Sequence, residues 1–224
     1  MKAMILAAGR GTRLRPLTNH IPKALVEAGS KTMLERSILH LREYGFDELI
    51  INLHHFPGKI RDYLQANNYF ATNITFSEES EHLLDTGGGL RKALWYFEDG
   101  APFLIRNVDV LSNLNLGQLL VRHRQENPLA TLVVRQRPTS RYLLFDRDNN
   151  LCGWENTKTH EKRMVREAKE FKKLAFSGIH VTTFDLLYYM PNKERFSIME
   201  TYLNAARECE VKAIDYPTAN KFFQ

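Results

Sequence analysis

Residues 6–18 read Leu6-Ala7-Ala8-Gly9-Arg10-Gly11-Thr12-Arg13-Leu14-Arg15-Pro16-Leu17-Thr18, and Pro22-Lys23 follow shortly after. They continue an apolar run from Met1 to Ala7 that predicts a buried strand. Gly9 and Gly11 allow a tight turn whose backbone N–H groups are not shielded by a Cβ atom. Arg13, Arg15 and Lys23 add positive charge, arginine as a bidentate fork and lysine as a mobile point charge. The pattern predicts a loop that clamps a polyphosphate.

Two common phosphate-binding loops do not fit this sequence. A P-loop needs G-x-x-x-x-G-K-[ST], but Gly9 and Gly11 form only G-x-G, and no Lys-Ser or Lys-Thr pair follows in register. A dinucleotide fingerprint needs a third glycine where this chain has Leu14. The bare G-x-G is weak evidence, and the cations together with Pro22-Lys23 make the pattern specific.

Composition indicates an ordinary globular protein. The chain has 224 residues, of which 43% are hydrophobic and 25% charged, so we expect one domain covering residues 1–224. It has no apolar run long enough to span a membrane, and its first residues lack the length of a signal peptide. We therefore expect a cytoplasmic protein that does not bind membranes.

Charge and cysteine content exclude further classes. The net charge of +5 could suggest nucleic-acid binding, but the densest basic run outside the first loop, Lys158 to Lys173, interleaves glutamates and is typical of a solvated segment. No nucleic-acid partner is expected, and RNA binding is the weakest alternative. Cys152 and Cys209 have no metal-ligand spacing, which favours free thiols over a disulfide or zinc site.

Strand-like and helix-like stretches alternate in the first half, which is typical of an α/β fold with a mostly parallel sheet. The second half differs, because its strands are joined by polar turns and are expected to be antiparallel. Expected strands cover residues 1–7, 48–53, 74–76, 102–105, 130–135, 142–145, 151–154 and 174–181, and expected helices cover 33–41, 57–64, 90–97, 184–190 and 198–206.

Asp109 follows the strand that ends near Ile105, at the carboxyl edge where ligands bind in open α/β sheets. A carboxylate there can hold Mg²⁺, which a nucleoside triphosphate needs to neutralise its charge. The alternative is that Asp109 only caps a helix beginning near Leu114 or forms a turn. A second glycine cluster, Gly87-Gly88-Gly89, precedes a helical segment and indicates a close approach of the backbone to another group.

The segment LAAGRGTRLRPLTNHIPKALV resembles the signature of the sugar-1-phosphate nucleotidyltransferases, and the similarity runs from Met1 to about Val181. Within this family the chain resembles short single-domain members, such as N-acetylmuramate-1-phosphate uridylyltransferase and mannose-1-phosphate guanylyltransferase-like proteins. The resemblance implies a Rossmann-like, three-layer α/β fold with a mixed, mostly parallel central sheet. Residues 1–110 would form a nucleotide-binding half and 111–224 a sugar-phosphate-binding half.

The resemblance also implies an activity and its residues. A nucleoside triphosphate and a sugar-1-phosphate would give a nucleotide-sugar and pyrophosphate, with Mg²⁺ as cofactor. The implied catalytic residues are Arg13, Lys23 and the metal ligand Asp109. The implied nucleotide-binding residues are Leu6, Ala8, Gly9, Gly11, Thr12, Glu78, Thr86, Gly87 and Gly88, and the implied substrate-binding residues are Asn107, Glu155 and Gly178, the last of which could instead be a plain β-bulge glycine.

Two departures from the family pattern keep alternatives open. Asn156 stands where the family has a lysine beside the sugar-binding acid, and Lys158 or Arg141 could replace it. The family's C-terminal Trp-x-Asp-Val-Gly-like motif, with its second metal ligand, is missing, and Asp215 is the one acidic residue after Glu210. The chain is either truncated before that motif or diverges from it. The alternatives are a cytidylyltransferase with a phosphocholine-like acceptor and a non-catalytic nucleotide-sugar sensor.

Overall fold

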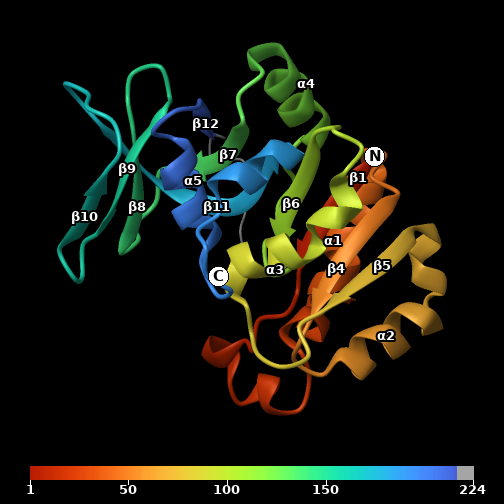
Figure 1. Ribbon diagram of the computed structural model, residues 1–224. Helices are drawn as coiled ribbons and strands as arrows, with labels where there is room; N and C mark the ends of the chain where they lie inside the picture. Colours follow the sequence, from red (N-terminus) through yellow and green to blue (C-terminus); the bar gives the residue numbers. More distant parts are fainter. Residues whose placement is uncertain (216–224) are drawn as a thin grey trace.

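A computed structural model of the chain describes residues 1–215. Its centre is a ten-stranded mixed sheet, in which β10-β9-β8-β11-β6-β1-β4-β5 lie side by side and β7 pairs with β11 and β12 (Figure 1). The strands are β1 (Lys2–Leu6), β4 (Glu48–Leu53), β5 (Asn73–Glu78), β6 (Phe103–Asn107), β7 (Ala130–Arg135), β8 (Arg141–Phe145), β9 (Leu151–Asn156), β10 (Glu161–Met164), β11 (Lys172–Thr182) and β12 (Val211–Asp215). β2 (Glu27–Ala28) and β3 (Lys31–Thr32) form a separate hairpin. The helices are α1 (Met33–Glu43), α2 (Pro57–Ala66), α3 (Asp85–Ala93), α4 (Leu116–Glu126) and α5 (Ile198–Ala205).

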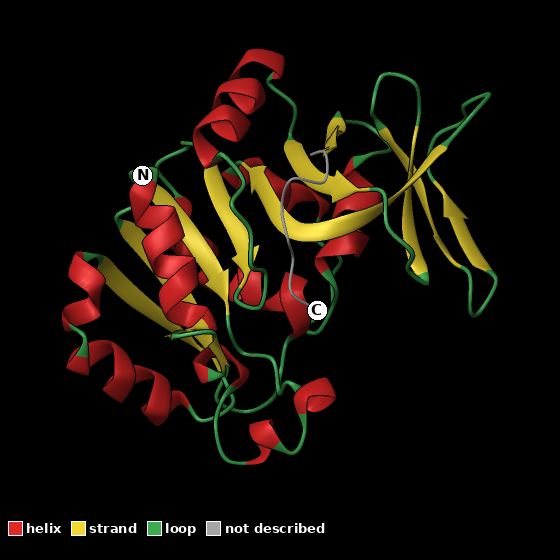
Figure 2. Ribbon diagram, turned by 180° about the vertical axis from the view of Figure 1, so that it is seen from behind, coloured by secondary structure: helices red, strands yellow, loops and turns green. Residues whose placement is uncertain are grey.

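Helices cover both faces of the sheet, as Figure 2 shows from behind. Alternating side chains of β1 explain this arrangement, because successive residues of a strand point to opposite faces. Met4 and Leu6 pack into one core with residues of α3 and α5, while Ala3 and Ile5 pack into the other with residues of α1, α2 and α4. The expected three-layer α/β fold is confirmed.

Strands β5, β4, β1 and β6 run parallel to one another. They come from the first half of the chain and form one side of the sheet. Their register places Leu6 beside both Asn52 and Asn107, so the carboxyl ends of three neighbouring strands meet. A site at this edge is therefore built from the ends of β1, β4 and β6.

The second half is mainly antiparallel, as expected. The long strand β11 pairs antiparallel with β6, β7 and β8 and so joins the two halves in one sheet. Its register shifts between Phe176 and His180, where Gly178 has a φ of 77°. Gly178 is therefore a bulge glycine, the alternative kept open by the sequence.

Two strands of the central sheet were not expected from the sequence. β10 lies in the polar run between Lys158 and Lys173, and all four of its residues are exposed, so its side chains carry no alternation that indicates a strand. β12 pairs parallel with β7 and places Val211 and Ala213 in the core. The strands expected at 130–135, 142–145 and 151–154 are confirmed, with small differences at their ends.

Helix α3 corrects the expectation that a helix begins near Leu90. It begins at Asp85 and contains Gly87, Gly88 and Gly89. A Cβ atom on Gly88 would lie 2.3 Å from the Glu194 carbonyl oxygen, and one on Gly87 would lie 2.4 Å from the Phe196 ring. The glycines are thus a packing requirement inside a helix rather than a loop before it.

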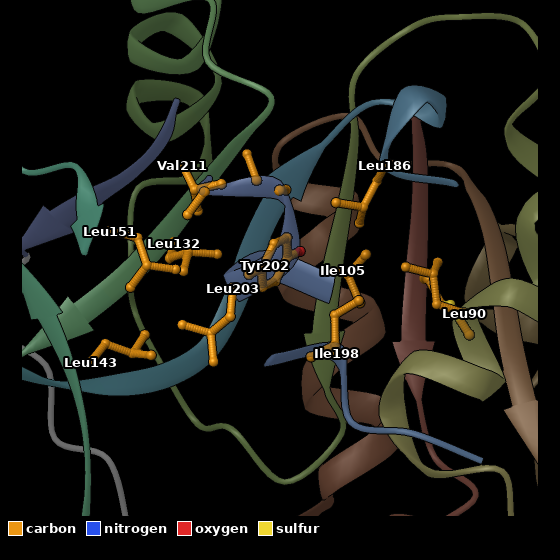
Figure 3. Packing of buried hydrophobic residues seen from close by; sticks show 14 of the residues in the cluster. Leu90, Ile105, Leu132, Leu143, Leu151, Leu186, Ile198, Tyr202, Leu203 and Val211 are labelled. Carbon is orange, nitrogen blue, oxygen red and sulfur yellow. The ribbon is translucent and has the colours of Figure 1, made fainter. Parts of the chain in front are cut away.

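The core between the sheet and helices α3 and α5 is continuous (Figure 3). Ile198, Tyr202 and Leu203 of α5 pack with strand residues that include Ile105 and Leu132. A fully buried side chain of this kind contributes about 1.5–3 kcal/mol by leaving water. Among residues 1–215, no helix combines the length and apolar character needed to cross a bilayer.

Candidate functional site

A cavity of about 200 Å³ lies at the carboxyl ends of β1, β4 and β6. Residues of four segments line it, namely the end of β1 with the loop after it, the end of β4, the start of α3, and the end of β6 with its following loop. The lining residues are Leu6, Ala7, Ala8, Gly9, Arg13, Lys23, Asn52, Leu83, Asp85, Thr86, Asn107, Val108 and Asp109.

The two loop glycines have different roles. Gly11 has a φ of 62°, and a Cβ atom there would lie 2.8 Å from Thr18 and 2.9 Å from Lys23. Gly9 lines the cavity, and a Cβ atom on it would meet nothing within 4 Å. Gly11 therefore allows the loop to pack on Lys23, and Gly9 leaves open space beside the backbone for a ligand.

Lys23 and Asp109 face each other across the cavity. Lys23 Nζ donates to Asp109 Oδ2, and the two side chains are 17% and 29% exposed. Arg13 lies on the same cavity and is largely exposed. The site thus holds two cations and a partly buried carboxylate within reach of one ligand.

The loop that carries Asp109 is tied to helix α1 through Arg106. The Arg106 guanidinium is 1% exposed, donates from Nη2 to the Val110 carbonyl, and contacts His40 Nδ1 from Nη1 at 3.1 Å. Burial lowers the pKa of Arg106 to about 10, and burial together with Arg106 lowers the pKa of His40 to about 4. A neutral His40 can donate from Nε2 to the Leu114 carbonyl and accept Arg106 at Nδ1, so both ends of the loop are fixed.

The start of α3 forms the opposite wall. Asp85 has a φ of 64° and accepts a hydrogen bond at Oδ1 from the Thr86 backbone N–H, at 2.6 Å. The Phe196 carbonyl accepts from Gly87 N at 2.9 Å, and Thr86 Oγ1 accepts from Ile198 N at 3.0 Å. The glycine-rich start of the helix is therefore held against the segment before α5.

The carboxylates suit a magnesium ion that shares its coordination with phosphates. Asp85 and Asp109 both line the cavity, and residues 1–215 contain no cluster of three or more His, Cys, Asp or Glu side chains that could hold a metal alone. Mg²⁺ is commonly bound by one or two carboxylates plus substrate phosphates and water. The donor set fits such an ion. Asp109 does not cap α4, because Asn115 does so through Oδ1.

Eight of the fifteen residues expected at the site line the cavity, namely the three catalytic residues, four of the nucleotide-binding residues and one substrate-binding residue, Asn107. Those that line the cavity are Leu6, Ala8, Gly9, Arg13, Lys23, Thr86, Asn107 and Asp109. Gly11 and Thr12 in the segment after β1, and Gly87 and Gly88 in α3, are neighbours in sequence of lining residues but do not line the cavity themselves. Glu78 lies outside, since its exposed carboxylate pairs with Arg61 at 2.7 Å.

The residues expected at the acceptor side are less closely grouped. Gly178 lies against Asn107, because a Cβ atom on Gly178 would be 2.7 Å from Asn107 Nδ2. Glu155 on β9 does not line the cavity and pairs with Lys173 of β11 at 2.6 Å. Arg141 and Lys158 are exposed, and Asp215 is exposed on β12.

Sequence reasoning missed Asn52, Asp85 and Leu83 on the cavity wall. Asn52 carried a usable signal, because it is a polar residue at the carboxyl end of the otherwise apolar strand Leu49–Leu53. Asp85 also carried a signal, because it is an acidic residue two positions before the glycine cluster Gly87-Gly88-Gly89. No pattern singled out Leu83.

The fold and this cavity define an α/β protein with a polar, partly cationic site at the carboxyl edge of its sheet, and the comparisons with known proteins identify its family. The model of the family described as nucleotidyl transferase matches residues 2–183, and the chain belongs to that family.

Relatives with named activities are similar over part of their length. A UTP–glucose-1-phosphate uridylyltransferase from Synechocystis is 30% identical over 212 residues, which is 88% of this chain and 53% of that protein. An N-acetylmuramate alpha-1-phosphate uridylyltransferase from Neisseria meningitidis is 41% identical over 115 residues, which is 51% of this chain and 49% of that protein. The chain thus spans about half the length of these curated relatives.

A solved structure supports the fold independently. The crystal structure of HddC from Yersinia pseudotuberculosis complexed with GMP-PN matches 99% of this chain and 92% of its own, with a TM-score of 0.76 and 21% sequence identity. At that identity the similarity concerns the fold.

Proposed function

We propose that this chain transfers a nucleoside monophosphate from a nucleoside triphosphate to a sugar-1-phosphate, releasing pyrophosphate. The observation that carries the proposal is the cavity at the ends of β1 and β6, where Arg13, Lys23 and the open Gly9 backbone face Asp109. Membership of the nucleotidyl transferase family and the names of its relatives support it.

In this mechanism an acceptor phosphate oxygen attacks the α-phosphorus in line, and the bond from that phosphorus to the oxygen bridging to the β-phosphate breaks. The attacking group is already an anion near neutral pH, so no protein nucleophile is required. Arg13 would hold the β- and γ-phosphates, and Lys23 would lie nearer the reacting phosphorus. Both stabilise charge that moves onto the leaving pyrophosphate.

Mg²⁺ is the proposed cofactor, held by Asp109 and assisted by Asp85 on the same cavity. When bound it would neutralise phosphate charge. Lys23 and Asp109 are bonded to each other, so Lys23 would have to move from Asp109 toward the phosphates as the ligand enters.

The acceptor would lie between Asn107, Gly178 and the sheet that carries Glu155. Lys173 pairs with Glu155, which leaves a cation beside this carboxylate although Asn156 replaces the family lysine. The proposed location is the cytoplasm, where triphosphates are abundant and where free Cys152 and Cys209 would stay reduced.

A pyrophosphate-release assay tests the proposal. The purified chain is mixed with Mg²⁺, each of ATP, CTP, GTP, UTP and dTTP, and a set of hexose-, hexosamine- and N-acetylmuramate-1-phosphates, with phosphocholine as a further acceptor. Release that depends on a sugar-1-phosphate supports the proposal. Release only with phosphocholine would favour the cytidylyltransferase alternative, and nucleotide binding without any release would favour a sensor.

A further inference from the structure

A buried carboxyl group connects the two walls of the nucleotide cavity. Glu79 follows β5 and is 2% exposed, and within residues 1–215 the hydrogen-bond partners of its two carboxyl oxygens are uncharged donors. Its Oε1 accepts from Asn52 Nδ2 at 2.7 Å, and its Oε2 accepts from the Leu84 backbone N–H at 2.8 Å. Both oxygens act as acceptors, which is the pattern of an ionised carboxylate.

Asn52 extends this contact to the glycine loop. It is 3% exposed, and its Oδ1 accepts from the Ala7 backbone N–H at 2.7 Å. The orientation of the amide is fixed by its neighbours, because Ala7 offers a donor and Glu79 an acceptor. A continuous path of hydrogen bonds therefore runs from Ala7, where the loop begins, through Asn52 and Glu79 to Leu84, where α3 begins.

The surrounding packing leaves this path no room to rearrange. A Cβ atom on Gly89 would lie 2.7 Å from Glu79 Oε1 and 2.8 Å from Asn52 Nδ2. Leu84 in turn accepts from Phe196 N through its carbonyl at 3.2 Å, so the path continues to the segment before α5. Gly89 is small because the two side chains occupy the space beside it.

We propose that Glu79 and Asn52 act as a positioning pair that sets the distance between the glycine loop and the start of α3, and thereby the fit of the cavity to a nucleoside triphosphate. Neither residue needs to touch the reacting atoms. Asn52 lines the cavity, and Glu79 acts through it and through Leu84. The inference rests on the proposed function for the identity of the ligand.

Exchanging the two functional groups tests the pair. Glu79→Gln alone turns one acceptor into a donor that faces the donor of Asn52 or Leu84. Asn52→Asp alone sets two carboxylates against each other. In the double variant the new carboxylate at position 52 accepts from Ala7 and from the new amide at position 79. The oxygen of that amide accepts from Leu84, so every hydrogen bond is restored in an almost unchanged volume.

The variants are compared by thermal midpoint, by calorimetric titration with the triphosphate that the wild-type chain binds, and by KM for each substrate. We expect each single variant to raise the Kd and KM for the triphosphate on the order of 10- to 100-fold, because a buried polar group loses its partner. The KM for the sugar phosphate should change little. The double variant should return within about threefold of wild type, as in a coupled pair.

Two exposed positions give matched controls, Asn73→Asp at the start of β5 and Glu81→Gln in the loop after it, and both should behave as wild type. Wild-type triphosphate affinity in both single variants would overturn the proposal. So would a double variant that regains the wild-type melting temperature without regaining affinity. Failure of the wild-type chain to release pyrophosphate would instead count against the proposed function. The positioning role could still be tested, because the titration measures the triphosphate affinity of each variant without turnover.

Discussion

Gly9 and Gly11 differ in what surrounds them. We therefore expect a substitution at Gly11 to lower the stability of the fold and one at Gly9 to weaken triphosphate binding. Gly11 combines a φ of 62° with two contacts that a Cβ atom would make below 3 Å, whereas a Cβ atom on Gly9 would meet no protein atom within 4 Å. Gly11→Ala should lower the free energy of unfolding by about 1–2 kcal/mol or more, because an L side chain is strained at that φ. Urea denaturation of the wild type and the variant measures this change in the free energy of unfolding.

Gly9→Ala should leave the urea midpoint unchanged and weaken triphosphate binding, because the new methyl group projects into space that the ligand would use. Calorimetric titration checks the affinity. Unchanged affinity together with an unchanged midpoint would mean that no ligand approaches Gly9.

Replacing Lys23 tests whether a specific cation in the cavity contributes to catalysis. Lys23→Ala should reduce kcat/KM roughly 100- to 1,000-fold, since a preorganised charge that stabilises the leaving phosphates is lost. Circular dichroism should remain that of the wild type. Arg124→Ala on the exposed side of α4 removes a cation away from the cavity and should have no effect. Equal losses in both variants would point to general electrostatic attraction instead of a specific contact.

Single-residue roles were only partly visible in the sequence. The cations and Asp109 could be found because each follows a recognisable strand and loop. Glu78 and Glu79 could not be told apart, because their roles depend on where β5 ends. Glu78 is its last residue and faces solvent, while Glu79 turns inward to Asn52.

At the scale of elements, the start of helix α3 is determined by tertiary packing and not by the helix propensity of its residues. Glycine is disfavoured in helices, so the sequence places Gly87 to Gly89 before one. Helix α3 nevertheless contains them, because residues 194–198 approach Gly87 and Gly88, and the side chains of Glu79 and Asn52 approach Gly89. Strands with an apolar pattern were predictable. β10 was not, because its four residues are all exposed and its position comes from pairing with β9.

Two helical glycines allow a test of this explanation. Gly58→Ala in α2 meets open space and should stabilise the protein by about 0.5–1 kcal/mol, the usual gain in a helix. Gly88→Ala should instead destabilise it, because the new methyl group would lie 2.3 Å from a backbone carbonyl oxygen. Urea denaturation of both variants gives the two signs. A stabilising Gly88→Ala would mean that α3 and the 194–198 segment are not in contact.

At the scale of the whole molecule, one sheet joins both halves through β6 and β11. The core beside α5 holds a buried histidine, His180, whose ring contacts that of Tyr202. Burial lowers the pKa of His180 from 6.5 to about 3, and neither ring nitrogen has a hydrogen-bond partner in residues 1–215. The unfolded chain therefore takes up a proton below pH 6.5 that the folded chain does not, so stability falls as the pH decreases.

The expected loss from His180 at pH 5 is about 2 kcal/mol relative to neutral pH, and His40 and His123 act in the same direction. Urea midpoints at pH 7.5 and pH 5 measure the total. His180→Phe should reduce the difference between the two midpoints by its share. An unchanged difference would mean that His180 is protonated in the folded protein.

The proposed function requires that the polyphosphate of the nucleoside triphosphate bind in the cavity at the ends of β1 and β6. A crystal structure of the chain with Mg²⁺ and the triphosphate that it turns over is the most direct measurement. We expect the phosphates against Gly9, Arg13 and Lys23, with the metal on Asp109 and the Lys23–Asp109 bond broken. Phosphates bound elsewhere, with that bond intact and the cavity at the ends of β1 and β6 empty, would contradict it.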